Sequence, residues 1–98
     1  MTTEEKNEAL FVSLVMMFQA AAMQHMGKVK NPATDKVERN LDQAQMSIDL
    51  LDMLLTKTKN NLKPDAERFL KDVLQDLKLN YVDEISKDSS EQAKGDGA

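Results

Sequence analysis

The apolar residues of this chain recur with a period close to 3.6, the repeat of an α-helix, along three stretches. Gly27 ends the first stretch and Pro64 stands at the start of the third, while glycine and proline are otherwise scarce. The pattern predicts an all-α protein, a three-helix bundle with long helices over about 2–26, 40–59 and 64–85.

The residues at the expected helix ends favour these boundaries. Thr2 and Glu5 have the spacing of a capping box, in which each side chain accepts a hydrogen bond from the other residue's backbone N–H. Gly27 is well placed for the left-handed conformation that ends many helices. Asn40 is a favourable N-cap with Gln43 three residues on, so we expect the second helix to begin there.

The link between the second and third helices is short. Asn60 or Asn61 can take a left-handed conformation in it, and Pro64 suits the first position of the third helix. A link of this length predicts an antiparallel hairpin. The longer connector over 28–39 leaves the placement of the first helix less constrained.

The last residues of the chain have a different composition. Residues 86–98 are rich in Ser, Lys, Asp, Gln and Gly and carry no apolar stripe. We therefore expect a single helical domain over 1–85 followed by a disordered C-terminal tail over 86–98.

The first two helices are apolar on two sides. One stripe of the first helix consists of Leu10, Phe11, Leu14, Phe18, Ala21 and Ala22. The opposite side of the first helix carries Ala9, Val12, Met16, Ala20 and Met23. The second helix has a tight seam of Leu41, Ala44, Ile48, Leu51 and Leu55, and a second seam of Met46, Leu50, Met53 and Leu54. The third helix has one stripe: Ala66, Phe69, Leu70, Val73, Leu74, Leu77, Tyr81 and Ile85.

A three-helix monomer covers about one face of each helix, so the second stripes would be exposed. Exposed patches of several large apolar side chains mark interfaces in soluble proteins. We therefore predict a homo-oligomer, most simply a two-fold dimer. Its candidate interface consists of Ala9, Val12, Met16, Ala20, Met23, Met46, Leu50, Met53 and Leu54. The alternative is a compact monomer with the first helix at its centre, since a buried helix can be apolar all round.

Composition removes several classes of function. The 98 residues include no cysteine, which excludes a disulfide scaffold and a cysteine nucleophile, and too few glycines for a phosphate-binding loop. His25 is the single histidine, and neither a serine–acid pair nor a second metal-ligand spacing accompanies it, so we expect a packing or capping role. We expect a protein that is not an enzyme, with no catalytic residues, cofactor or metal.

Two groups of charged residues leave further functions open. Asp42, Asp49 and Asp52 share one face of the second helix. This spacing would suit a divalent cation, but we expect a face that contacts solvent and lysines, because no Glu with a His three residues on accompanies the row. The candidate basic junction, defined as Lys57, Lys59 and Lys63, and the basic connector over 28–39 are the places where phosphate groups would bind.

A nucleic-acid or nucleotide accessory protein is therefore the alternative function. The net charge of −4, the absence of stacking aromatics near these lysines and the repulsion of anions by a helix C-terminus argue against it.

An apolar run over 9–23 raises the question of membrane insertion. The run contains fifteen residues, two of which are polar, whereas a membrane-spanning helix needs about 20. Its flank carries Glu4, Glu5 and Glu8 against Lys6, the wrong sign for a signal peptide. We expect a cytoplasmic protein that does not bind membranes. Peripheral membrane association through the first helix is the last of the alternatives, because this helix lacks a polar face rich in lysine and arginine.

Several short sequence segments follow one another in the order found in a known protein family. They are Ser13-Leu14, His25-Met26-Gly27, Asn31-Pro32, Asn40-Leu41, Lys57-Thr58-Lys59-Asn60-Asn61-Leu62, Asp76-Leu77-Lys78 and Tyr81-Val82. Through them, the stretch from Phe11 to Val82 resembles a small bacterial family catalogued as domain of unknown function 1844. This resemblance implies an all-helical protein of unassigned biochemistry and supplies no catalytic residues.

The chain departs from the family pattern at three positions. Asn60 replaces a glycine, Lys63 replaces a threonine cap, and Lys78 stands where arginine is common. Loss of the threonine cap weakens the start of the third helix by about 1 kcal/mol.

The second apolar stripes and the resemblance together indicate the function that we expect. It is that of a small bacterial helical protein that self-associates and acts as a protein–protein interaction or scaffold module, with an unidentified protein as a further partner.

Overall fold

Three α-helices follow one another in the computed structural model, which describes the backbone of residues 1–97 and the side chains of residues 1–89. They are α1 (Thr3–Met26), α2 (Leu41–Lys57) and α3 (Pro64–Gly97). Within these residues no β-strand is present. The predicted all-α, three-helix fold is therefore confirmed.

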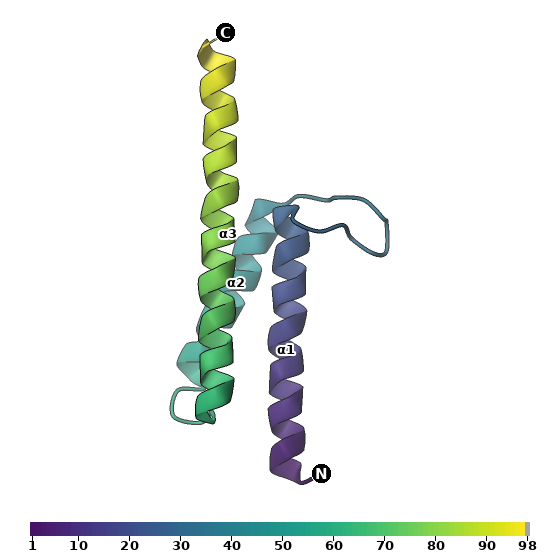
Figure 1. The fold of residues 1–98 in the computed structure, drawn as a ribbon, viewed down its shortest axis with the longest axis vertical. Helices are drawn as coiled ribbons and strands as arrows, with labels where there is room; N and C mark the ends of the chain where they lie inside the picture. Colours follow the sequence, from purple (N-terminus) through teal and green to yellow (C-terminus); the bar gives the residue numbers. More distant parts are fainter. Residues whose placement is uncertain (98) are drawn as a thin grey trace.

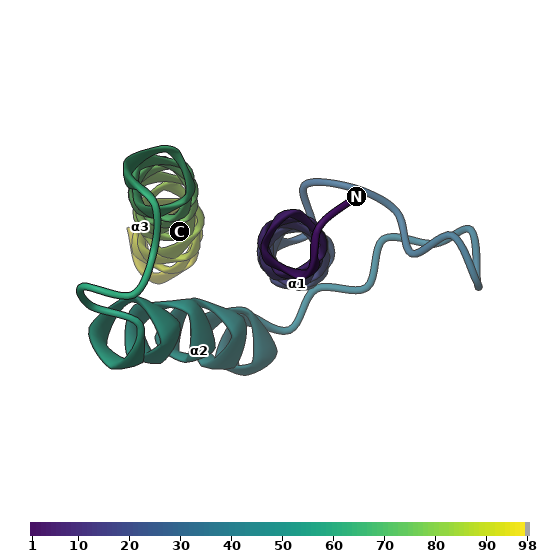
Figure 2. The ribbon, with the colours of Figure 1, turned by 90° about the horizontal axis from the view of Figure 1, so that it is seen from below.

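The helices form two layers. α1 and α3 lie side by side and run in the same direction, and α2 crosses behind them in the opposite direction (Figures 1 and 2). Each helix packs against the other two. The antiparallel α2–α3 hairpin agrees with the prediction, and the structure decides the placement of α1, which the connector length had left open.

The predicted caps of α1 are present. The Thr2 hydroxyl accepts a hydrogen bond from the Glu5 N–H at 3.1 Å, and the Glu5 carboxylate accepts one from the Thr2 N–H at 3.3 Å. At the other end Gly27 has a φ of 82°. The N–H groups of Gly27 and Lys28 donate to the carbonyls of Gln24 and Met23, which is the Schellman arrangement.

The hairpin ends also follow the sequence. The Asn40 side chain accepts a hydrogen bond from the Gln43 N–H at 3.2 Å, and α2 begins at the next residue. α2 ends at Lys57, two residues before the expected end, and the Thr58 hydroxyl donates to the Leu54 carbonyl at 2.6 Å. Asn60 takes the left-handed conformation with a φ of 70°, so the turn forms without the family's glycine.

One core joins the three helices. Its buried residues are Val15, Ala22, Met26, Ala44, Ile48, Leu51, Leu70, Val73, Leu74 and Leu77. The tight seam of α2 and most of the α3 stripe therefore face inward as predicted. On α1, however, the buried arc is rotated from the expected stripe: Val15 is fully buried, whereas Leu10 and Leu14 are exposed. The helical wheel of α1 does not settle its rotation because apolar residues occupy both sides.

The end of α3 departs from the prediction in two ways. Ile85, the last member of the expected stripe, is exposed, and Glu84 is buried in its place because cations from the connector surround it. The helix also continues past residue 85 to Gly97 and projects beyond the other two helices (Figure 1). The tail predicted to be disordered over 86–98 overlaps this extension: the backbone of residues 86–97 continues α3, while residue 98 and the side chains from 90 onward lie outside the described residues.

Candidate functional site

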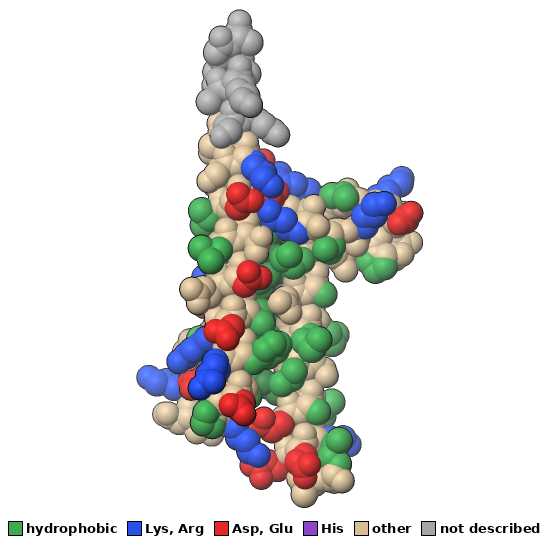
Figure 3. Space-filling view, viewed as in Figure 1, with side chains coloured by type: hydrophobic (Ala, Val, Ile, Leu, Met, Phe, Trp, Pro, Cys, Tyr) green, Lys and Arg blue, Asp and Glu red, His purple; other side chains and the backbone are tan. Residues whose placement is uncertain are grey.

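The side of α1 that faces away from the core is apolar and exposed to solvent. We define the outer apolar face as Ala9, Leu10, Leu14, Met16, Met17 and Ala20, all of which are exposed. Leu10, Met16 and Met17 are 57%, 53% and 68% exposed. Figure 3 shows hydrophobic side chains gathered over α1. The compact-monomer alternative required α1 to be enclosed by the other two helices. It is not enclosed by them.

The nine residues of the predicted interface are divided by the structure. Its exposed members are Ala9, Met16, Ala20, Met46 and Met53, and its half-buried members are Val12, Met23, Leu50 and Leu54. Met23 and Leu54 pack against the core. The α1 and α2 members belong to different layers of the fold, so the outer apolar face on α1 is the more continuous candidate (Figure 2).

Residues that the sequence placed on the inner stripe enlarge this face. Leu10 and Leu14 lie on it because of the rotation of α1, and Met17 belonged to neither predicted stripe. The signal for Met17 was available in the sequence: it lies near the middle of a helix segment without a single ionisable residue, from Ala9 to Gln24.

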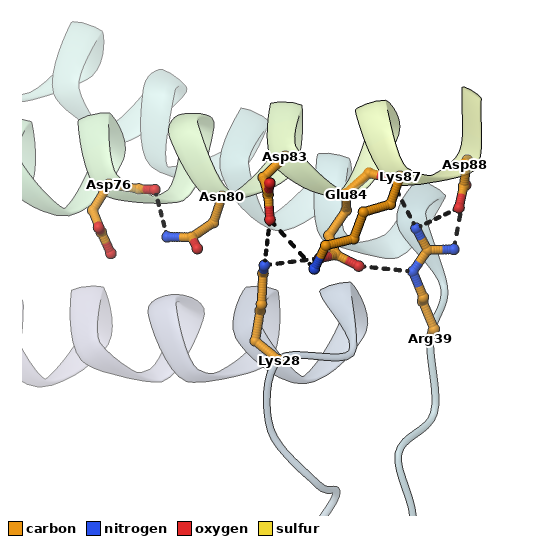
Figure 4. A network of polar contacts seen from close by, with 8 residues as sticks. All are labelled: Lys28, Arg39, Asp76, Asn80, Asp83, Glu84, Lys87 and Asp88. Atoms are coloured by element: carbon orange, nitrogen blue, oxygen red, sulfur yellow. Dashed lines mark hydrogen bonds and ion pairs between the residues drawn. The ribbon is translucent and has the colours of Figure 1, made fainter. Parts of the chain in front are cut away.

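A polar clasp ties the connector to α3. We define it as Lys28, Arg39, Asp83, Glu84, Lys87 and Asp88 (Figure 4). The Lys28 ammonium lies 2.9 Å from the Asp83 carboxylate and 2.8 Å from that of Glu84. Arg39, at the other end of the connector, lies 3.2 Å from the Glu84 carboxylate and 2.8 Å from that of Asp88. Both ends of the connector are therefore held on the same turns of α3.

Glu84 is the centre of the clasp. Its side chain is only 9% exposed, and it also accepts a hydrogen bond from Lys87 at 2.9 Å. Hydrogen bonds from Lys28 and then Lys87 lower the pKa of the Glu84 carboxyl to about 2, against the opposing effect of burial. The same two lysines lower the pKa of Asp83. The clasp thus holds its carboxylates in the charged form.

The connector is closed at its base by the backbone. The Asn40 N–H donates to the His25 carbonyl at 2.7 Å, which brings the start of α2 against the end of α1. A Cβ on Gly27 would lie 3.3 Å from the Arg39 side chain, so the missing side chain makes room for the arginine stem. His25 therefore contributes to the fold through its backbone, which the sequence alone did not indicate.

The tip of the connector is a tight turn. The Asn31 side chain accepts a hydrogen bond from the Ala33 N–H at 2.9 Å, and the Asn31 N–H donates to the Lys36 carbonyl at 2.8 Å. Asp35 takes a left-handed conformation with a φ of 55°. This Asn-Pro turn explains why the segment projects sideways without helical structure (Figure 1).

Three of the other candidate charged residues, Lys63, Asp49 and Asp52, make contacts within the chain. Lys63 of the basic junction lies 3.5 Å from Glu4 of α1, while Lys57 and Lys59 are exposed. In the aspartate row, Asp52 pairs with Lys78 at 3.0 Å and Asp49 accepts a hydrogen bond from Gln45. Among the described residues no group of three or more His, Cys, Asp or Glu side chains could hold a metal ion.

The sequence analysis missed a groove between α2 and α3. Its volume is about 410 Å³, and its apolar wall consists of Leu55, Leu74, Leu79 and Val82. Leu79 and Val82 are exposed on the side of α3 that the single-stripe interpretation treated as polar. Their three-residue spacing, which places both on one side of the helix, could have indicated this second apolar surface in the sequence.

α1 is also long and apolar enough to cross a membrane, judged only by its length and composition. Signal sequences and the core helices of soluble proteins meet the same criteria.

These features define a small all-helical protein with a polar clasp and a large exposed apolar face. A family model described as Domain of unknown function (DUF1844) matches residues 8–83, and the chain belongs to this family. No curated protein and no solved structure matches the chain. The family match confirms the resemblance found in the sequence.

Proposed function

We propose that this protein is a non-enzymatic, cytoplasmic interaction module that self-associates through the outer apolar face of α1. The observation that carries the proposal is the exposure of Leu10, Met16 and Met17 on one helix surface without ionisable groups. Contiguous exposed apolar surface of this kind is typical of protein interfaces.

Burial of this surface would favour association. Full burial of a leucine or methionine side chain contributes roughly 1.5–3 kcal/mol. Several such side chains contribute enough to offset part of the translational and rotational entropy lost on association, which is at least about 4 kcal/mol. The helices themselves are already formed in the monomer, so little additional ordering opposes binding.

Sedimentation velocity of the full chain at micromolar concentration tests the proposal. We expect the unmodified chain to sediment as an oligomer and Met17→Glu to sediment as a monomer, because the new carboxylate would be buried in the interface. Leu79→Glu is the matched control, since Leu79 is similarly exposed but lies on α3. A monomeric unmodified chain, or equal losses in both variants, would contradict the proposal.

The nucleic-acid alternative has less support, because Lys28, Arg39 and Lys63 already pair with carboxylates of the same chain. Binding to a mixed single- and double-stranded DNA probe across salt concentrations tests it. Phosphate contacts would give affinity that falls steeply with salt, whereas no binding at low salt would eliminate this function.

A further inference from the structure

The charges of α1 are segregated along its length. Glu4, Glu5 and Glu8 lie in the first two turns with Lys6 as the only cation. No ionisable residue occurs from Ala9 to Gln24. After this segment come His25 and, in the connector, Lys28 and Lys30. The helix is therefore acidic at its N-terminus, uncharged along the outer apolar face and basic beyond its C-terminus.

Met17 lies at the centre of the uncharged segment. It is the most exposed large apolar side chain of α1, at 68%. On its N-terminal side the exposed residues include the large Leu10 and Leu14 with the small Ala9 and Ser13, whereas Ala20 and Ala21 on its C-terminal side are both small. A reversed copy can therefore set a large side chain of one helix against a small one of the other.

We propose that the occupant of the outer apolar face is α1 of a second copy of this chain, packed antiparallel about a two-fold axis that passes near Met17. This inference rests on the proposed function and specifies the partner and its orientation. In this arrangement Leu14 lies opposite Ala20 of the second copy, and Ser13 lies opposite Ala21. The alanines allow the two helices to approach closely.

Charge complementarity selects the antiparallel orientation. It places the first two turns of each copy, with Glu5 and Glu8, beside the end of α1 and the start of the connector of the other, where His25 and Lys30 follow. Glu4 contributes less, because it already lies 3.5 Å from Lys63 of its own chain. The antiparallel orientation also places the N-terminal, positive end of each helix dipole beside the negative end of the other. Lys6 comes near Lys28 of the second copy, but Lys28 is already paired with Asp83 and Glu84 of its own chain. A parallel pair would instead bring six glutamates together.

The absence of cysteine makes this orientation directly measurable. Single variants Met17→Cys, Lys6→Cys and Leu79→Cys of the full chain are treated with a short bis-maleimide cross-linker. In the antiparallel pair, two copies of position 17 meet on the axis. Two copies of position 6 are separated by about 33 Å along the helix, from a rise of 1.5 Å per residue, and the linker does not reach.

We expect Met17→Cys to give a cross-linked dimer. Lys6→Cys and Leu79→Cys should give none. We also expect a mixture of Leu10→Cys and Gln24→Cys chains to yield a cross-linked heterodimer, since positions 10 and 24 are equally distant from 17. Sedimentation of each variant shows whether the substitution itself has prevented association.

Other outcomes separate the inference from the proposed function. Efficient cross-linking of Lys6→Cys would show a parallel pair and overturn the inference, although the chain still self-associates. Cross-linking only through Leu79→Cys would place the interface on α3 and overturn it as well. A chain that remains monomeric but floats with vesicles of mixed anionic and neutral lipids would overturn both, because the face would then bind lipid.

Discussion

The polar clasp and the outer apolar face differ in where their partners come from. In the clasp, two cations of the connector and one of α3 meet three carboxylates of α3, so every charge has an opposite charge within the same chain. In the outer apolar face, Leu10, Met16 and Met17 have more than half of their surface exposed. One surface is complete in the monomer, and the other is not.

This difference separates two kinds of stability. The clasp contributes to the folding of a single chain, so its contribution does not depend on protein concentration. If a second copy covers the outer apolar face, as proposed, the contribution of this face would grow with concentration by mass action. Substitutions in the two regions therefore have distinguishable consequences.

The largest effect is expected at the centre of the clasp. Glu84→Gln removes the carboxylate that Lys28, Arg39 and Lys87 share, and should lower the free energy of unfolding by about 2 kcal/mol. Urea unfolding at low protein concentration measures this change. Glu67→Gln is the control: it removes an exposed pair with Lys71 and one acidic residue of the first turn of α3, and it should change stability by less than about 1 kcal/mol. Equal effects would show that the clasp adds nothing.

Acidification should weaken the same contact. The pKa of Glu84 is about 2 in the folded chain and 4.5 in its ordinary state, so folding favours the charged carboxylate. This contribution is fully present above 4.5 and is lost as the pH falls toward 2. The unmodified chain should therefore lose more unfolding free energy over this range than Glu84→Gln does. Parallel pH dependences in denaturant titrations would argue against a protonation effect at Glu84.

A smaller effect is expected at the base of the connector. Gly27→Ala places a Cβ in a left-handed residue and 3.3 Å from the Arg39 side chain, which should cost about 1–2 kcal/mol. Thermal unfolding followed by circular dichroism measures it. The change Asn60→Gly, at the left-handed position of the α2–α3 turn, is the control and should be neutral or slightly stabilising. An unchanged melting temperature for Gly27→Ala would contradict this prediction, because it would show that the helix cap adjusts to the new side chain at no cost.

The smallest effect on the dilute monomer is expected at the outer apolar face. Met17→Ser should change the unfolding free energy by less than about 0.5 kcal/mol when the chain is monomeric, because its side chain is mostly exposed. The melting temperature of the unmodified chain should rise as its concentration is raised, whereas that of Met17→Ser should not change. Leu79→Ser is the control that should keep the rise. A concentration-independent melting temperature for the unmodified chain would remove the distinction between the two regions.

The helix ends were predictable because capping depends on residues close in sequence. Thr2 with Glu5, Gly27, and Asn40 with Gln43 each satisfy or terminate a helix through local hydrogen bonds. These interactions form whatever the rest of the chain does. The helix order and the α2–α3 hairpin followed from the same local signals.

The candidate surface was only partly predictable. The sequence correctly indicated that α1 has more apolar surface than one bundle covers, but it assigned Leu10 and Leu14 to the inside and did not identify Val15 as core. A helix that is apolar on both sides packs in more than one rotation, and contacts with α2 and α3 select one. Similarly, nothing local to α3 indicates that Glu84 is buried and Ile85 exposed.

The sequence by itself determined where the helices begin and end, and that one of them has an excess of apolar residues, because both depend on short-range patterns. Only the tertiary structure decided which side of α1 is exposed and which carboxylate is enclosed. The exposed side of α1 depends on its contacts with α2 and α3, and the enclosure of Glu84 depends on Lys28 and Arg39 reaching α3 across 45 or more positions of the chain. Such long-range contacts form only after the three helices have packed.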